Sequence, residues 1–364
     1  ALPGSHPERL EHLAWLEGDG ALSLDTRPSG QSVRLLQFHR LGRRQVAEPV
    51  CSLGETPLAG VGLAMGSYLL EIGQDPPVHY PVSIGRREHH RAGRLELPGQ
   101  LGEGECYVPA GPFWSGGDDE ALDPLPRRLI DLPGFVIQRF QITHAEFLDF
   151  LNDLQASRQA EEAWLYQPRA ASEHEQGAPV YGLGESGWFL KPDEDEDVWQ
   201  SDWPVFQIDR QAALAYGFWR SRRDGLPWRL PGELEWEKAA RGVDGRFFPW
   251  GDHLDPSWCC IRASHQGRPM PAAVDSFPMD CSVYGVRGLA GNVRDMCADA
   301  WDKGGPILDD GVPLAPQPPG PGQRMVARGG RWSGHARAAR LCSRGAVPAT
   351  ARLPNLGFRL ARSL

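Results

Sequence analysis

One group of cysteine and histidine residues has types that could support metal chemistry. Cys259, Cys260, His265 and Cys281 could together hold zinc, which favours thiolate and imidazole ligands. Adjacent cysteines are poor joint ligands, however, and the chain contains no CxxC pair. We therefore expect these residues to be structural.

An acidic run and a histidine pair are further candidate metal ligands. Residues 193–197 read DEDED, but calcium loops usually need a tight turn that glycine permits, and this run contains no glycine. His89 and His90 are adjacent, so on a strand they would point to opposite faces and could not converge on one ion. We expect a solvated loop at the acidic run and a solvated basic turn at the histidines.

Length and composition place the chain among soluble globular proteins. Its 364 residues are 41% hydrophobic and 23% charged, which suits two domains with ordinary cores. No segment approaches the roughly 18–20 apolar residues of a membrane span, and the first residues lack the order of a signal peptide. The seven cysteines lack the spacing of a disulfide scaffold. These features predict a cytoplasmic protein without membrane insertion.

Charge is unevenly distributed along the chain. The formal net charge is -9, yet residues 321–364 contain nine arginines and no aspartate or glutamate. Exposed arginines would indicate nucleic-acid binding, whereas arginines that pair with internal carboxylates would form a scaffold. We predict the scaffold, with Arg328, Arg340, Arg344 and Arg359 paired and mostly buried, and no nucleic-acid partner.

The sequence divides into two regions with different patterns. Residues 1–19 are expected to form an N-terminal helix or linker, and the short alternating runs of residues 20–98 predict a small β-sandwich. Residues 105–364 contain 12 of the 13 tryptophans and predict an α+β domain. One helix should follow Thr143, where Glu146 completes a capping box, and others should span residues 210–222 and 233–241.

Both regions resemble known families. The sequences GETPL (54–58) and LAMGSYLLEI (63–72) resemble those of the PEGA domain, a small β module. The second region resembles the formylglycine-generating-enzyme (sulfatase-modifying-factor) family. That resemblance rests on ordered motifs: THAEF (143–147), WRLPGELEWE (228–237), FPWGD (248–252), YGVRGLAGNV (284–293), RGGRW (328–332) and GFR (357–359). It implies an α+β, C-type-lectin-like fold, here preceded by the small β-sandwich.

The family resemblance also implies where catalytic metal ligands should lie. Oxidases of the family bind copper through two cysteines in a pattern like RGGSYLCHxSYC, because thiolates bind Cu(I). The matching positions here are Gly334 and Ala339, and Cys342 lies three residues beyond the second. One thiolate cannot replace a pair, so we predict that the chain is not an enzyme. A divergent oxidase that uses Cys342 with His335 is the less favoured alternative.

Calcium is the one cofactor that the resemblance leaves open. Family members bind Ca²⁺ near a GN(V/A)WEW motif, and Asn292 and Asp295 keep oxygen ligands at the matching positions. Arg294 replaces the usual tryptophan. Cys297 follows in a helix-like stretch, 293–297, and is predicted to be a buried apolar residue.

Irregular stretches alternate with framework residues in segment 331–356. This segment resembles the variable region of diversity-generating-retroelement proteins that use the same fold. Adenine mutagenesis of AAY codons cannot yield Lys, Gln, Glu, Met or Trp, and residues 333–364 contain none of them. The resemblance implies an exposed surface that binds a protein or other macromolecular ligand. Its predicted members are Arg331, Trp332, Ser333, Gly334, His335, Ala338, Leu341, Cys342, Ser343, Gly345, Ala346, Val347, Thr350, Leu353, Pro354 and Asn355. The alternative is the sensor or interaction region of a bacterial Ser/Thr kinase.

Overall fold

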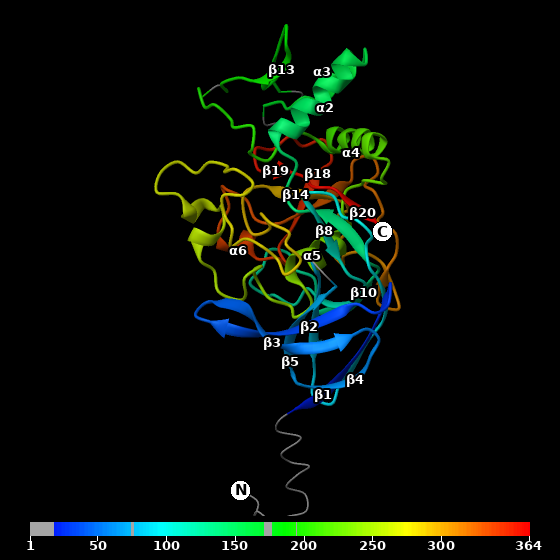
Figure 1. The fold of residues 1–364 in the computed structure, drawn as a ribbon. Helices are drawn as coiled ribbons and strands as arrows, with labels where there is room; N and C mark the ends of the chain where they lie inside the picture. The colour runs from blue at the N-terminus through cyan, green and yellow to red at the C-terminus, as the bar shows by residue number, and fades with distance from the viewer. Residues whose placement is uncertain (1–17, 74–75, 171–176, 194) are drawn as a thin grey trace, which may run out of the picture.

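Two β-sheets with a shared core form the N-terminal part of the protein (Figure 1). The computed structural model describes residues 18–73, 76–170, 177–193 and 195–364. The sheet orders are β4-β1-β7 and β3-β2-β5-β6. The strands are β1 (Asp19–Arg27), β2 (Ser32–Leu41), β3 (Arg44–Glu55), β4 (Leu58–Ala64), β5 (Gly66–Ile72), β6 (Val78–Ile84) and β7 (His89–Glu96).

Alternation along these strands builds the shared core. Leu22 and Leu24 of β1 pack in one cluster with Leu70 and Ile72 of β5, and all four side chains are buried. The helix expected within residues 1–19 falls almost entirely outside the described residues. The basic turn expected at His89 is wrong, because that residue begins β7 and pairs with Ala21 of β1.

The larger part of the chain is α+β, with more strands than helices. Its strands are β8 (Glu105–Val108), β9 (Gly111–Ser115), β10 (Arg128–Leu132), β11 (Phe135–Gln138), β12 (Tyr181–Gly184), β13 (Gly187–Leu190), β14 (Arg294–Ala300), β15 (Leu308–Asp309), β16 (Val312–Pro313), β17 (Arg324–Arg328), β18 (Arg344–Pro348), β19 (Leu356–Gly357) and β20 (Ala361–Ser363). Its helices are α2 (His144–Ala156), α3 (Ala160–Tyr166), α4 (Arg210–Asp224), α5 (Glu233–Arg241) and α6 (Ala336–Ala339), with 3-10 turns η1 (Pro256–Trp258) and η2 (Arg262–Ser264).

The three predicted helices are present. Thr143 caps α2, and the Glu146 carboxylate accepts the Thr143 backbone N–H at 2.8 Å in the expected capping box. Helix α4 runs two residues past its predicted end and is closed by Gly225, whose φ is 68°. Helix α5 has the predicted bounds. Among the described residues, no helix is long and apolar enough to cross a membrane.

The central sheet, of order β18-β17-β14-β19, separates two hydrophobic cores. Met296 of β14 packs in the core that includes α2 and α4, while Cys297 packs in the core beside α5. The helix-like pattern predicted for 293–297 is therefore wrong, because both faces of this strand are buried and its sequence shows no simple alternation. The predicted burial of Cys297 is confirmed.

A second sheet joins distant parts of the chain. Strand β11 pairs with β8 on one side and with β20, close to the C-terminus, on the other (Figure 1). This pairing holds the final residues of the chain against the start of the α+β part.

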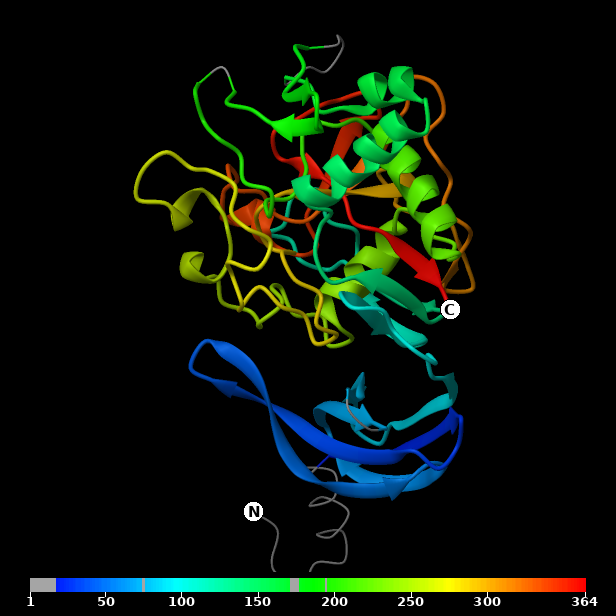
Figure 2. The ribbon, with the colours of Figure 1, turned by 45° about the horizontal axis from the view of Figure 1, so that its top comes forward.

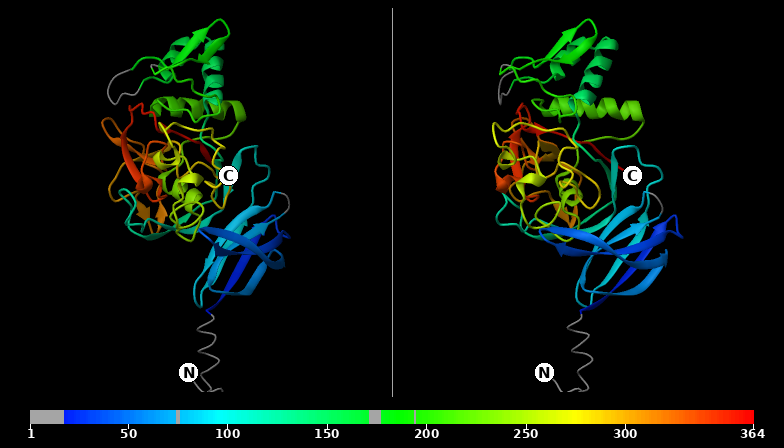
Figure 3. Two further views of the ribbon diagram at one scale, coloured as in Figure 1. Left: turned by 90° about the vertical axis from the view of Figure 1, so that its left-hand side faces the viewer. Right: turned by 60° about the vertical axis from the view of Figure 1, so that its left-hand side comes forward.

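The two parts are in direct contact (Figures 2 and 3). The backbone N–H of Gln45 in β3 donates to the Trp250 carbonyl at 2.7 Å, and the Ser67 hydroxyl lies 3.1 Å from an Asp244 carboxylate oxygen. The Tyr107 hydroxyl donates to the Glu96 carbonyl at 2.6 Å. These contacts fix the N-terminal sheets against the larger part.

Candidate ligand-binding surface

A buried network of arginines and glutamates underlies segment 331–356. Helix α5 follows a Leu-Pro-Gly turn, and Glu233 and Glu237 from its first two turns are buried in the interior. Arg344 Nε lies 2.5 Å from Glu233 Oε1, and Arg328 lies 3.2 Å from Glu233 and 2.8 Å from Glu237. Arg241 lies 2.8 Å from Glu237. All five side chains are at most 1% exposed, so the network is fully internal.

The network keeps the Glu237 carboxylate ionised. Burial alone would raise the pKa of Glu237, but the guanidinium groups of Arg328 and Arg241 outweigh it and lower that pKa to about 2. The Gly116 backbone N–H adds a hydrogen bond of 2.8 Å. Multiple charge-assisted contacts of this kind hold the side chains in one arrangement.

The other two arginines of the predicted scaffold, Arg340 and Arg359, also have acidic partners. Arg359 Nε lies 2.7 Å from Asp295 Oδ2 in the interior. Arg340 pairs with Asp118 at 3.1 Å and with Glu120, and its side chain is 13% exposed. The expected paired and mostly buried arginine scaffold is confirmed.

The expectation that the predicted surface is wholly exposed is wrong. Residues 344–347 do not form a loop, because they belong to β18, which pairs with β17 in the central sheet, and the turn at 341–343 that leads into this strand is buried. The predicted surface residues that are buried are Gly334, Ala338, Leu341, Cys342, Ser343, Gly345 and Val347. Those that remain exposed or half-buried are Arg331, Trp332, Ser333, His335, Ala346, Thr350, Leu353, Pro354 and Asn355.

Two parts of the remaining surface lie side by side. The Trp332 indole N–H donates to the Pro354 carbonyl at 2.9 Å, and the Asn355 amide donates to the Ser333 hydroxyl at 3.2 Å. Trp332 and Leu353 also pack against the core that includes α2 and α4. These contacts bring residues 331–333 and 353–355 together. We use the name terminal surface for these residues and the other exposed or half-buried members of the predicted set given above.

The positions that match the family's copper cysteines are tightly packed. A Cβ atom at Gly334 would lie 2.8 Å from Arg331 Cγ and 3.0 Å from the Arg331 carbonyl oxygen. Ala339 is fully buried in a cluster with Phe248 and Trp250. Cys342 is 1% exposed, and burial raises the pKa of its thiol to about 12. These residues do not fit a dithiolate copper site.

The two residues expected to hold calcium bind different partners. The Asn292 side-chain amide bonds the Ala272 backbone through both its oxygen and its nitrogen, at 3.2 and 2.8 Å. Asp295 Oδ2 accepts from the Trp236 indole N–H and from Arg359, each at 2.7 Å. Asp295 Oδ1 has no hydrogen-bond partner among the described residues, and calcium at these two residues stays a prediction.

The other metal candidates do not form a ligand cluster. Among the described residues, no group of three or more His, Cys, Asp or Glu side chains is placed to hold a metal ion. Cys260 Sγ lies 3.7 Å from His265 Nε2, but burial raises the pKa of this thiol to about 12. Arg268 bridges Asp195 and Asp197 of the acidic run at 2.8 and 2.7 Å. That run is thus neutralised in part by a neighbouring loop.

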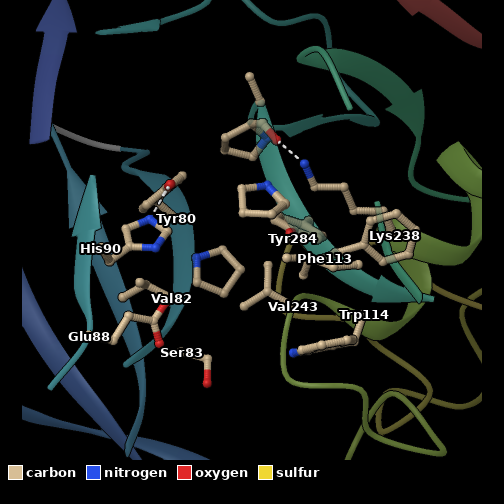
Figure 4. Close-up of a pocket in the computed structure, with 15 residues that line it drawn as sticks. Tyr80, Val82, Ser83, Glu88, His90, Phe113, Trp114, Lys238, Val243 and Tyr284 are labelled. Atoms are coloured by element: carbon tan, nitrogen blue, oxygen red, sulfur yellow. Dashed lines mark hydrogen bonds between the residues drawn. The ribbon is translucent and has the colours of Figure 1, made fainter. Parts of the chain in front are cut away.

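A cavity of about 130 Å³ lies between the two parts of the chain and was not predicted from the sequence. Figure 4 shows Tyr80 and His90 on the N-terminal wall and Phe113, Lys238 and Tyr284 on the opposite wall. Lys238 donates to two backbone carbonyls, those of residues 109 and 111, each at 2.7 Å, and burial lowers its pKa to about 7. A lysine in the predicted helix 233–241, in a chain with only three lysines, was the available signal.

The chain is similar in sequence to one protein family and to several individual proteins. Residues 96–364 match the family described as the sulfatase-modifying factor enzyme 1-like domain. The mouse formylglycine-generating enzyme is 28% identical over 287 residues, covering 70% of this chain and 73% of that enzyme. The mouse protein named inactive C-alpha-formylglycine-generating enzyme 2 is 26% identical over 298 residues, with coverages of 74% and 89%. The Chlamydia trachomatis serine/threonine-protein kinase Pkn1 is 27% identical over 227 residues, covering 62% of this chain and 33% of the kinase.

Two solved structures share the fold. PvdO from Pseudomonas aeruginosa superimposes with a TM-score of 0.54 at 22% identity, over 71% of this chain and 94% of PvdO. Treponema denticola variable protein 1 superimposes with a TM-score of 0.50 at 20% identity, over 71% of this chain and 95% of that protein. At these identities the similarity shows a common fold.

Proposed function

The chain belongs to the sulfatase-modifying factor enzyme 1-like domain family, and within that family we propose that it is a non-catalytic binding protein. Its ligand would be a protein or other macromolecule that contacts the terminal surface. We further propose that the family part has a C-type-lectin-like topology and that the N-terminal sheets form a PEGA-like module.

The proposal rests on the residues at the two positions that match the family's copper cysteines. Gly334 leaves no room for a Cβ atom unless the Arg331 backbone or side chain shifts. Ala339 fills a packed core position with no exposure. The nearby Cys342 thiol is buried and stays protonated at neutral pH, because burial raises its pKa. These features support binding over thiolate-based oxidation.

The arrangement of the terminal surface supports a display role. Its residues project from an internal scaffold in which Glu233 and Glu237 bind three arginines. Because all of these ion pairs are buried, substitutions of the surface side chains should have little effect on the stability of the domain. Trp332 would supply the largest contact area, and tryptophan is enriched at binding hot spots.

Relatives support a non-catalytic family member. One mouse relative is itself named an inactive formylglycine-generating enzyme. One structural neighbour is named a variable protein, and what it shares with this chain is the fold. We propose diversification only at the exposed or half-buried members of the terminal surface, because random substitution of buried positions would disrupt packing.

A sensor role within a kinase is the second candidate. The observation that favours it is the similarity to Pkn1, of which the matched region covers 33%. This alternative also uses a binding surface, so it differs from the first in the context of the domain. A kinase domain encoded in the same reading frame would favour the sensor, whereas a neighbouring reverse transcriptase with a near-copy template repeat would favour the variable protein.

Two matched libraries test the binding surface. One library randomises the exposed or half-buried members His335, Ala346, Thr350, Pro354 and Asn355, and the other randomises an equal number of buried members. The buried set is Gly334, Leu341, Cys342, Gly345 and Val347. Folding is scored by protease resistance of the displayed full chain, and binding by enrichment against a panel of purified proteins.

We expect the two libraries to differ in folding. Most members of the exposed library should keep the protease resistance of the parent and should yield specific binders, while most members of the buried library should be degraded. Equal loss of resistance in both libraries, or an exposed library that folds but never yields a binder, would refute the display role.

A further inference from the structure

Arg294 is a buried guanidinium that forms no ion pair within the part of the chain that the structure describes. The residue is 7% exposed, and the one hydrogen bond that its guanidinium makes among the described residues runs from Nε to the Gly329 carbonyl at 3.1 Å. Its Nη2 atom is buried and has no hydrogen-bond partner in residues 18–73, 76–170, 177–193 and 195–364. No carboxylate of the described residues lies within ion-pair distance of this side chain. Such a group is costly in a protein interior, because a buried charge needs a compensating partner.

The environment of Arg294 contrasts with that of the scaffold arginines. Arg328, Arg344 and Arg359 are each within 3.2 Å of a buried carboxylate. The stronger electrostatic influences on Arg294 come instead from two other arginines, Arg331 and Arg328. Burial, followed by repulsion from Arg331 and Arg328, lowers the pKa of Arg294 to about 10, so its guanidinium is still charged at neutral pH.

The chain makes room for this guanidinium beside the terminal surface. Arg294 begins β14, and its Nη1 atom would lie 2.0 Å from a Cβ atom at Gly345 of β18, so the side chain crosses the sheet over β17. The Arg294 backbone N–H donates to the Asn355 carbonyl at 2.9 Å, which places the residue directly against the terminal surface. Glycine at position 345 is therefore required for the arginine to adopt this position.

Arg331 supplies a second guanidinium close by, because the N–H of the next residue, Trp332, donates to the carbonyl of Asn292 at 2.7 Å, two residues before Arg294 in the chain. Arg331 is half-buried, and no ion pair joins it to an acidic residue among those described. Asp123 is the acidic group that acts on Arg294 electrostatically, but it is exposed and forms no ion pair with it. Two neighbouring guanidiniums that form no ion pair with a carboxylate of the described residues create a local positive potential.

We infer that Arg294 and Arg331 form an oxyanion-binding site at the base of the terminal surface. The ligand group is a carboxylate or a phosphate on the bound molecule, and this assignment rests on the proposed binding function. Guanidinium groups suit such ligands because their planar N–H donors match two oxygens at once. Binding would compensate the charge of the two guanidiniums and would relieve the repulsion between them.

Anion-dependent stabilisation of the full chain tests the inference. The probes are inorganic phosphate and, separately, acetate, each compared with chloride at constant ionic strength. The variants are Arg294→Met, which keeps an unbranched side chain of similar length, and Arg331→Ala. Arg91→Ala is the matched control, because Arg91 is exposed on β7 in the N-terminal sheets. The melting temperature and the dissociation constant of each probe are measured.

We expect phosphate, acetate or both to raise the melting temperature of the wild type and of Arg91→Ala. Each site variant should weaken binding of that probe by roughly tenfold or more, since hydrogen bonds to charged groups are among the stronger ones. Arg294→Met should also be at least as stable as the wild type in chloride, because it removes an unpaired buried charge. Preference for phosphate over acetate would indicate a phosphorylated ligand, and the reverse a carboxylate.

Several results would overturn the site. Absence of stabilisation by both probes would do so, as would equal shifts in the wild type and both site variants. Strong destabilisation of Arg294→Met in chloride, together with unchanged probe affinity in Arg331→Ala, would show a structural role instead. If the exposed library yields binders but neither anion binds, the oxyanion site fails and the proposed function stands. If the anions bind but the exposed library yields no binders, the oxyanion site stands and the proposed function fails.

Discussion

Replacing Glu237 by glutamine should strongly destabilise the protein. Glu237 is 1% exposed and binds Arg328 and Arg241, each at 2.8 Å. Its carboxylate also accepts from the Ser115 hydroxyl at 3.0 Å and from the Gly116 N–H at 2.8 Å. The amide of Glu237→Gln carries no charge, so the two arginines lose the negative charge that compensates them. Its N–H₂ group would also face groups that donate hydrogen bonds to the Glu237 carboxylate.

Two independent routes give a similar magnitude. Removal of one partner from a buried ion pair costs about 3–5 kcal/mol. The pKa of Glu237 falls from the ordinary 4.5 to about 2 on folding, which corresponds to about 3 kcal/mol at about 1.36 kcal/mol per unit. For domains of this general size, such a loss lowers the melting temperature by roughly 6–20 °C.

The pH dependence identifies the cause. Because the pKa of Glu237 is depressed in the folded state, its contribution is present above the unfolded pKa and disappears as the pH falls toward about 2. The stability gap between the wild type and Glu237→Gln should thus be full at about pH 6 and shrink below about pH 4.5. Denaturant unfolding followed by tryptophan fluorescence measures this gap at each pH.

A matched variant controls for charge loss alone. Glu96 faces Arg27 at 3.9 Å and is 57% exposed, so Glu96→Gln should change the free energy of unfolding by less than about 1 kcal/mol. If Glu237→Gln lowered the free energy of unfolding no more than Glu96→Gln does, or by an amount independent of pH, the view that the buried network stabilises the domain would be refuted.

Further predictions concern packing, a buried lysine and thiol reactivity. Gly334→Cys should lower stability by about 1–3 kcal/mol through overpacking, whereas Gly267→Cys, whose Cβ would meet open space, should be nearly neutral in the same melting assay. Burial lowers the Lys238 pKa to about 7, so the folded state binds fewer protons than the unfolded state between that pH and about 10. The free energy of unfolding of Lys238→Met, relative to that of the wild type, should therefore be higher at about pH 6 than at about pH 9.5. Native labelling by a thiol reagent should modify the exposed Cys51 quickly and the buried Cys342 only on unfolding, as read by mass spectrometry.

Local signals in the sequence predicted the helices and the scaffold. The Thr143 and Glu146 capping box identifies the start of α2 without tertiary information. An arginine-rich, acid-free terminal segment in an acidic chain requires internal carboxylates, and Glu233 and Glu237 supply them. Such predictions succeed because each depends on composition or on spacing over a few residues.

Predictions that needed tertiary context were less successful. Residues 341–347 are irregular in sequence, which is typical of a loop, but residues 344–347 form part of β18, an edge strand of the central sheet whose side chains are mostly buried. The unpaired state of Arg294 depends on which carboxylates other arginines occupy. The fold decides which arginine binds which carboxylate, so residue type and spacing alone do not show which arginine is left without one.

Cysteine oxidation by the purified full chain is the decisive assay for the non-catalytic assignment. The chain is supplied with Cu(I), oxygen and a cysteine-containing peptide, with an active formylglycine-generating enzyme as the positive control, and the peptide is read by mass spectrometry. We expect no formylglycine in the peptide and the same result for Cys342→Ser, because Gly334 and Ala339 provide no thiolate pair. Formylglycine produced by the wild type and abolished in Cys342→Ser would contradict the assignment.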